Sequence, residues 1–95
     1  MQEKELLDEA MEELEGAKHY AKCAMKYRDS DPAKSKRYYD MAQDELRHAD
    51  NLYRMAGQET EKHTALETAF LDEQRDSYAE MGGKIKAMLD MYRGT

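Results

Sequence analysis

The sequence is poor in the residues that interrupt helices or favour strands. It contains one proline, five glycines and almost no valine or isoleucine. Alanine, leucine, methionine, glutamate, lysine and arginine predominate, and all six are good helix formers. This composition excludes a sheet-based fold and predicts an all-α protein. With 95 residues, the chain forms one small domain, near the size at which a single core gives only modest stability.

Long apolar runs and paired cysteines are also missing. No segment approaches the roughly 20 apolar residues of a membrane span, and the charged residues 1–7 do not resemble a signal peptide. The single cysteine, Cys23, cannot form an intrachain disulfide, which is typical of a reducing compartment. We therefore expect a cytoplasmic protein, and we interpret Cys23 as a small helix residue in preference to a redox centre.

Positive charge is in deficit, because the formal net charge is -6. Such a surface repels the phosphates of nucleic acids and of anionic membranes, so neither is expected as a partner. Charged residues make up 38% of the chain and the mean hydropathy is -1.09, which is polar for a compact monomer. Long helices with narrow apolar stripes, buried partly against another chain, would reconcile this polarity with folding.

The apolar periodicity predicts an antiparallel helical hairpin over residues 1–57. Alanine, leucine and tyrosine recur with a 3.6-residue period over residues 3–28, which indicates the first helix. Ser30 or Asp31 can cap a second helix whose first residue is Pro32, and Gly57 is a typical stop after Ala56. So short a connection makes the two helices antiparallel neighbours.

The pattern of residues 58–95 predicts a C-terminal helical segment, which either packs as a third helix or is free for docking and oligomerisation. It begins at Thr60, or at Thr64 with Glu67 as a capping box. The pair Gly82-Gly83 weakens helicity, so we expect a bend or break there, with a last amphipathic piece over residues 84–92. The expected inward face consists of Ala65, Leu66, Ala69, Phe70, Glu73, Ser77, Tyr78 and Met81.

Two polar side chains interrupt the apolar stripe of the second helix. Glu45 and His48 are three residues apart and therefore lie on one helical face. If the hairpin turns near Ser30, the rise of about 1.5 Å per residue places Glu13 of the first helix within about one turn of both. The neighbours of Glu13 are expected on the solvent side, namely Asp8, Glu12, Glu15, Gly16 and His19.

Two carboxylates and one imidazole predict a metal site. This donor set suits iron, manganese or zinc, and it lacks the thiolates usual in structural zinc sites. A dinuclear site in a helical bundle takes one Glu from each of two helices and a Glu-x-x-His from each of the other two. The chain holds half of that set, since Glu45–His48 is its single Glu-x-x-His. A homodimer of hairpins would complete the set and form a four-helix bundle.

The segments 13–20 and 41–49 resemble the ferritin-like superfamily, most closely its rubrerythrin-type helices. The shared features are Glu13 seven residues before Tyr20, followed about thirty residues later by Glu45 and His48. A short chain with one such half is similar to the encapsulated ferritins, whose di-iron centre forms across a subunit interface. The resemblance implies a ferritin-like hairpin over residues 1–57, with Glu13, Glu45 and His48 as iron ligands and Tyr20 beside them. It also implies ferroxidase-like activity toward Fe(II) with O2 or peroxide, and a protein compartment shell as a partner. Manganese uses the same ligands as iron, so it is the second candidate metal.

A rival interpretation needs no metal. Glu45 and His48 can form ordinary polar contacts on a helix flank, in a non-catalytic oligomerisation or adaptor module. We interpret the tyrosines and methionines as packing residues, and Glu15 with His19 as a solvated pair. Glu73 on the third segment is a reserve ligand, and His63 receives no role.

Overall fold

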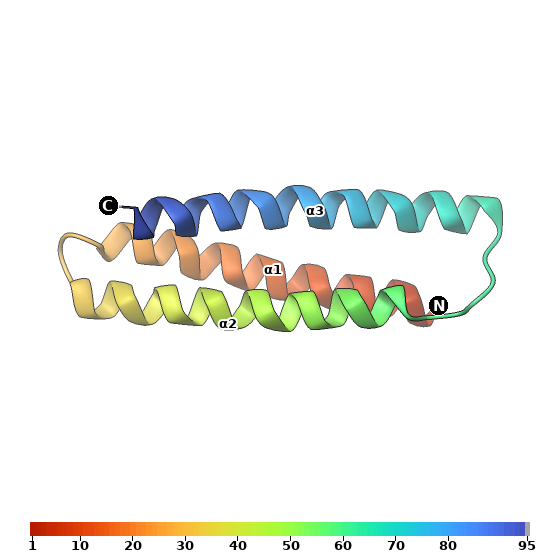
Figure 1. Ribbon diagram of the computed structural model, residues 1–95, viewed down its shortest axis with the longest axis horizontal. Coiled ribbons are helices and arrows are strands. Elements are labelled where there is room, and N and C mark those ends of the chain that lie inside the picture. Colours follow the sequence, from red (N-terminus) through yellow and green to blue (C-terminus); the bar gives the residue numbers. More distant parts are fainter. Residues whose placement is uncertain (95) are drawn as a thin grey trace.

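Three long helices make up most of residues 1–94, the part of the chain that the computed structural model describes. They are α1 (Gln2–Tyr27), α2 (Pro32–Gly57) and α3 (Ala65–Arg93). The helices lie side by side in a rod of 52 × 17 × 16 Å, with α2 antiparallel to both α1 and α3 (Figure 1). The predicted all-α fold is confirmed. Over residues 1–94, no helix is long and apolar enough to cross a membrane.

The hairpin of α1 and α2 has the expected ends to within one or two residues. Asp31 caps α2, because its side chain accepts a hydrogen bond from the Lys34 N–H at 3.2 Å, and Pro32 occupies the first turn. α1 and α2 make the most extensive contact in the bundle. Small buried side chains allow this close approach, and they are Ala10, Ala17, Ala21, Ala42 and Ala49.

α3 is one continuous helix through Gly82-Gly83, so the expectation of a bend or break there is wrong. No described glycine has a positive φ, and both glycines keep helical geometry. The helix tolerates them because Tyr78 and Ile85, on either side, are buried and hold it to the rest of the bundle. Of the two predicted starts, the capping box formed by Thr64 and Glu67 is confirmed and Thr60 is wrong.

The predicted inward face of α3 is wrong over its first half. Leu66 is 82% exposed, and Phe70 and Glu73 are exposed as well. α3 instead buries a stripe spaced by sevens, made of Leu71, Tyr78 and Ile85 with Gly82 and Leu89. The sequence contains two apolar stripes on this helix, and periodicity alone does not say which of them meets the hairpin.

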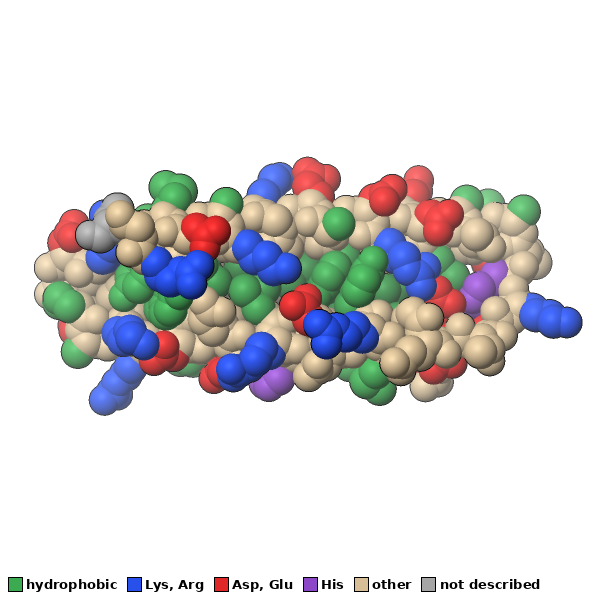
Figure 2. All heavy atoms as spheres, viewed as in Figure 1, with side chains coloured by type: hydrophobic (Ala, Val, Ile, Leu, Met, Phe, Trp, Pro, Cys, Tyr) green, Lys and Arg blue, Asp and Glu red, His purple; other side chains and the backbone are tan. Residues whose placement is uncertain are grey.

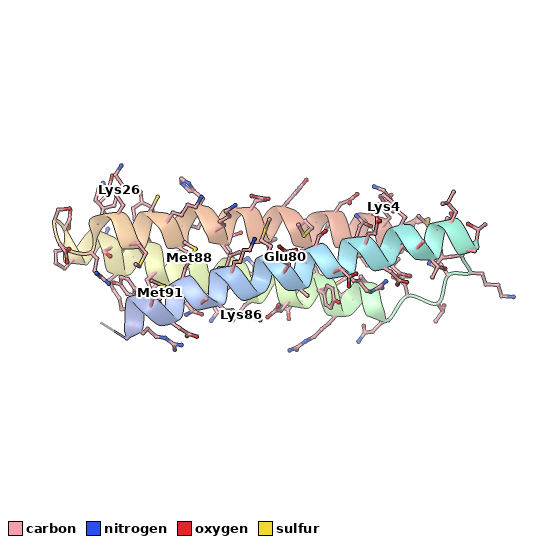
Figure 3. The ribbon with its side chains drawn as sticks, turned by 90° about the horizontal axis from the view of Figure 1, so that it is seen from above. Lys4, Lys26, Glu80, Lys86, Met88 and Met91 are labelled. Carbon is pink, nitrogen blue, oxygen red and sulfur yellow. The ribbon has the colours of Figure 1, made fainter. Side chains whose placement is uncertain are left out.

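α3 packs mainly on α1 and contacts α2 less closely. From above, α3 lies over the hairpin, with Glu80 and Met88 toward α1 and Lys86 toward α2 (Figure 3). The space-filling view shows hydrophobic side chains in the furrow between α3 and α2, with charged side chains along both rims (Figure 2). The hairpin thus has one side covered by α3 and one side left open.

A buried ion cluster fastens the start of α3 to the start of α1. Glu3 is buried, with 7% of its surface exposed. Its Oε1 lies 2.9 Å from His63 Nε2, and its Oε2 accepts a hydrogen bond from the Arg75 guanidinium. The Glu3 N–H also donates to Glu61 Oε1 at 2.8 Å. Burial alone would raise the pKa of the Glu3 carboxyl, but the hydrogen bonds from His63 and Arg75 outweigh it and lower that pKa. His63, to which the sequence assigned no role, is therefore a structural residue.

Candidate metal centre

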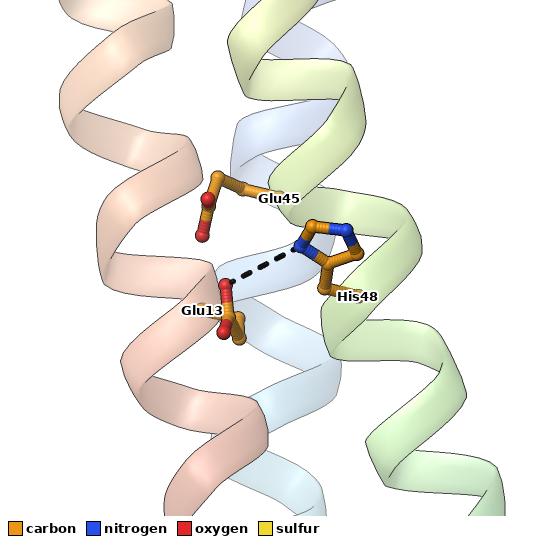
Figure 4. A group of neighbouring side chains, drawn as sticks. All are labelled: Glu13, Glu45 and His48. Atoms are coloured by element: carbon orange, nitrogen blue, oxygen red, sulfur yellow. Dashed lines mark ion pairs between the residues drawn. The ribbon is translucent and has the colours of Figure 1, made fainter.

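The hairpin brings the three expected side chains together on its open side. Glu13 comes from α1, and Glu45 and His48 come from α2 (Figure 4). One ligand atom from each of them lies within 4.8 Å of the other two, and His48 Nδ1 is 3.9 Å from Glu13 Oε2. Among the residues that the structure describes, this is the one group of three or more potential metal ligands at such distances. The convergence agrees with the predicted register, while metal binding itself stays a prediction.

Local sequence explains the convergence. The three-residue spacing turns Glu45 and His48 to the same face of α2, and the short turn after α1 fixes which residues of α1 they oppose. Fully buried Ala17 and Ala49 keep the two backbones close at this height. The carboxylates can therefore meet across the hairpin without long side chains between them.

Gly16 also contributes to this geometry, although the sequence placed it on the solvent side. A Cβ atom at Gly16 would lie 3.1 Å from Glu45 Oε2, so the Glu45 carboxylate occupies the space where a side chain would stand. The expectation is wrong because Gly16 follows Glu13 by three residues and so shares part of its face. The sequence does contain a signal for this contact, because Gly16 is a glycine within an otherwise strong helix, one turn from a candidate ligand.

The Glu13 carboxyl perturbs the carboxyl of Glu45 across the hairpin. The pKa of Glu45 is raised, first by its hydrogen bond with the Glu13 carboxyl, then by partial burial and by the Glu13 charge, while His48 acts in the opposite direction. A like charge this close disfavours the ionised form of Glu45. A bound divalent cation would offset this repulsion and would be favoured by the same closeness.

The donor chemistry fits a metal ion of the iron, manganese or zinc type. Glu13 and Glu45 offer hard carboxylate oxygens and His48 offers an imidazole nitrogen, while the thiol of Cys23 is outside the group. The group is also accessible, since the side chain of His48 is 59% exposed. Three protein ligands on an open face leave coordination positions for further ligands from water, substrate or a second chain.

The other candidate residues have contacts of their own. Tyr20 is half-buried and stacks on Tyr38, with ring centroids 6.1 Å apart, and its expected place beside the metal ligands stays a prediction. Glu73, the reserve ligand, is exposed on α3. His19 lies beside Cys23, with Nε2 and Sγ 3.7 Å apart.

Over residues 1–94, fold and site together define an all-α structure of three helices with one group of two carboxylates and a histidine on the open side of its hairpin. No family model, curated protein or solved structure matches the chain.

Proposed function

We propose that this protein is a ferritin-like di-iron protein that oxidises Fe(II), with a metal centre completed across a homodimer interface. The observation that carries the proposal is the convergence of Glu13, Glu45 and His48 within 4.8 Å on an open helical face. The Glu45 pKa is raised because the two carboxyl groups lie close together, which is unfavourable without a counterion and favourable for binding a cation.

The open side of the hairpin supports a homodimer. Met41 is 40% exposed and Met55 is 49% exposed, and each lies seven residues from His48 along α2. A stripe with this spacing is typical of a helix seam that meets another helix. In Figure 4 the site faces away from α3, so a second hairpin can approach it directly. Two hairpins would form a four-helix bundle with four Glu and two His around the site.

The chain's own residues have clear tasks in such a centre. Glu13 and Glu45 would bind the metal through their carboxylate oxygens, and His48 would supply a nitrogen ligand. Their carboxylate oxygens favour ferric over ferrous iron, which draws electrons from Fe(II). Two Fe(II) ions held there as substrate would supply one electron each, and with two protons these electrons would reduce peroxide to two waters or O2 to hydrogen peroxide. Manganese shares these ligand preferences and is the second candidate metal.

Storage of the oxidised iron would need an enclosed space, which one small dimer lacks. A larger homo-oligomer or a surrounding protein compartment would supply it. Oxidation without storage, as in peroxide detoxification, requires the dimer alone.

The second candidate is a non-catalytic oligomerisation or adaptor module without a metal. The exposed Leu66 and Phe70 on α3 favour it, because they offer an apolar surface to a partner. It gives no reason for two carboxylates and an imidazole to converge at one height of the hairpin.

An anaerobic Fe(II) titration followed by admission of air tests the proposal. We expect one iron per chain and a rise in near-ultraviolet ferric absorbance that is faster than in buffer. Glu45→Ala and His48→Ala should abolish both, whereas Glu73→Ala, which removes an exposed glutamate on α3, should change neither. Iron binding that is unchanged in both site variants would contradict the proposal.

A further inference from the structure

Gly16 is an unexpected residue at its position in α1. It lies in the interior of a 26-residue helix, where glycine is less favourable than alanine because it loses more backbone entropy on folding. No described glycine has a positive φ, so the backbone at Gly16 is open to any L-residue. A conformational reason for glycine is therefore absent, and a steric reason remains.

The Glu45 carboxylate supplies the steric reason. A Cβ atom at Gly16 would lie 3.1 Å from Oε2, 3.5 Å from Cδ and 3.7 Å from Cγ of Glu45. The first distance is shorter than an ordinary van der Waals contact between carbon and oxygen. Any side chain at Gly16 would therefore push Glu45 by a few tenths of an ångström from the place where it meets Glu13.

We propose that Gly16 is a positioning residue of the metal centre, whose missing side chain provides the space in which Glu45 coordinates. This inference rests on the function proposed above. In the metal-free protein the end of the flexible Glu45 side chain can move aside at little cost. In the metal-bound protein it cannot, because metal–ligand distances tolerate only about 0.2 Å of variation. The cost of a side chain at Gly16 therefore falls on metal affinity and not on folding.

Gly16→Ala tests the inference, with Gly83→Ala as its matched control. Gly83 also lies inside a helix, is exposed, and has no atom within 4 Å of its hypothetical Cβ. The measurements are the melting temperature of the metal-free protein, the Fe(II) or Mn(II) dissociation constant without oxygen, and the oligomer mass. We expect both variants to melt at or above the wild-type temperature, because alanine favours helix. We expect Gly16→Ala alone to weaken metal binding, by about tenfold, as other residues that orient metal ligands do.

Three outcomes would overturn the inference. Gly16→Ala could bind metal as tightly as the wild type, or Gly83→Ala could lose as much affinity. Gly16→Ala could also lose affinity together with its oligomeric state, which would assign Gly16 to subunit contact and not to Glu45. A wild-type protein that binds no metal would instead refute the proposed function, so the two failures are distinguishable.

Discussion

In the metal-free protein, the surroundings of Glu45 disfavour the ionised form of its carboxyl group. Its carboxyl faces Glu13 across the hairpin, and the pair raises the pKa of Glu45. A raised carboxyl pKa means that the folded state favours the protonated form, so the ionised pair opposes folding at neutral pH. This arrangement is unfavourable for stability alone and favourable for holding a cation.

Glu45→Gln should therefore stabilise the metal-free protein at pH 7, by about 0.5 kcal/mol for a partly exposed pair, while it abolishes metal binding. The sign follows from the raised pKa. The wild type recovers stability as the pH falls toward the ordinary glutamate value of 4.5, so the advantage of the variant shrinks in acid. Chemical denaturation at several pH values measures the difference. Glu12→Gln, an exposed neighbour on α1, is the control, and an equal gain in that variant would contradict the assignment to the pair.

Glu3 is the opposite case, a carboxylate whose pKa is lowered because His63 and Arg75 hold its charge. Glu3→Gln should cost about 2 kcal/mol at neutral pH, because it leaves buried donors without a charged acceptor. A lowered pKa contributes stability above the ordinary value of 4.5 and loses it as the pH falls through the folded-state value. The variant and the wild type should therefore converge in acid, as measured by urea unfolding. Glu9→Gln, exposed on the same helix, should cost nothing at any pH.

The hairpin and α3 have separate tasks at the level of elements. All three candidate ligands belong to α1 and α2, and the turn between these helices fixes their register. α3 covers the other side of the hairpin through Leu71, Tyr78, Ile85 and Leu89. α3 therefore contributes side chains to the core but none to the candidate metal centre.

Ile85→Ala should separate these tasks. Ile85 is fully buried, so its truncation leaves a cavity and should lower the free energy of unfolding by about 3 kcal/mol. Where the variant is still folded, its metal stoichiometry should equal that of the wild type. Met91→Ala, at an exposed position on α3, should leave both unchanged. Loss of metal binding in a folded Ile85→Ala protein would show that α3 shapes the site.

Local signals in the sequence predicted the hairpin well and α3 less well. Asp31, Pro32 and the Thr64–Glu67 capping box act through adjacent residues, so they mark helix ends without tertiary information. The meeting of Glu13 with Glu45 follows from a short turn and a constant helical rise. The buried face of α3 does not follow, because the helix offers two apolar stripes and tertiary packing chooses between them. The Glu3–His63 pair joins residues far apart in the chain, so no local pattern predicts it. The contact of Gly16 with Glu45 also crosses the hairpin, and its one local signal is a glycine inside an otherwise strong helix.

At the scale of the whole molecule, the open side of the hairpin is the surface that the proposed homodimer would bury. Met41 and Met55 lie on it, one on each side of His48 along α2. Replacing either with lysine would place a charge in the proposed seam, where burial of an unpaired ammonium is costly. We expect Met41→Lys and Met55→Lys to shift the protein from dimer to monomer in sedimentation experiments and to lose iron with it. Met91→Lys, exposed on α3, should do neither, and a variant monomer that binds iron as the dimer does would contradict a shared centre.

Native mass spectrometry of the protein loaded with Fe(II) under anaerobic conditions tests the central claim most directly, because one spectrum reports the oligomeric state and the iron count together. We predict that iron is found on dimers, with two ions per dimer, and that His48→Ala yields iron-free protein. Iron carried by monomers, or a dimer that carries none, would contradict a metal centre built from two hairpins.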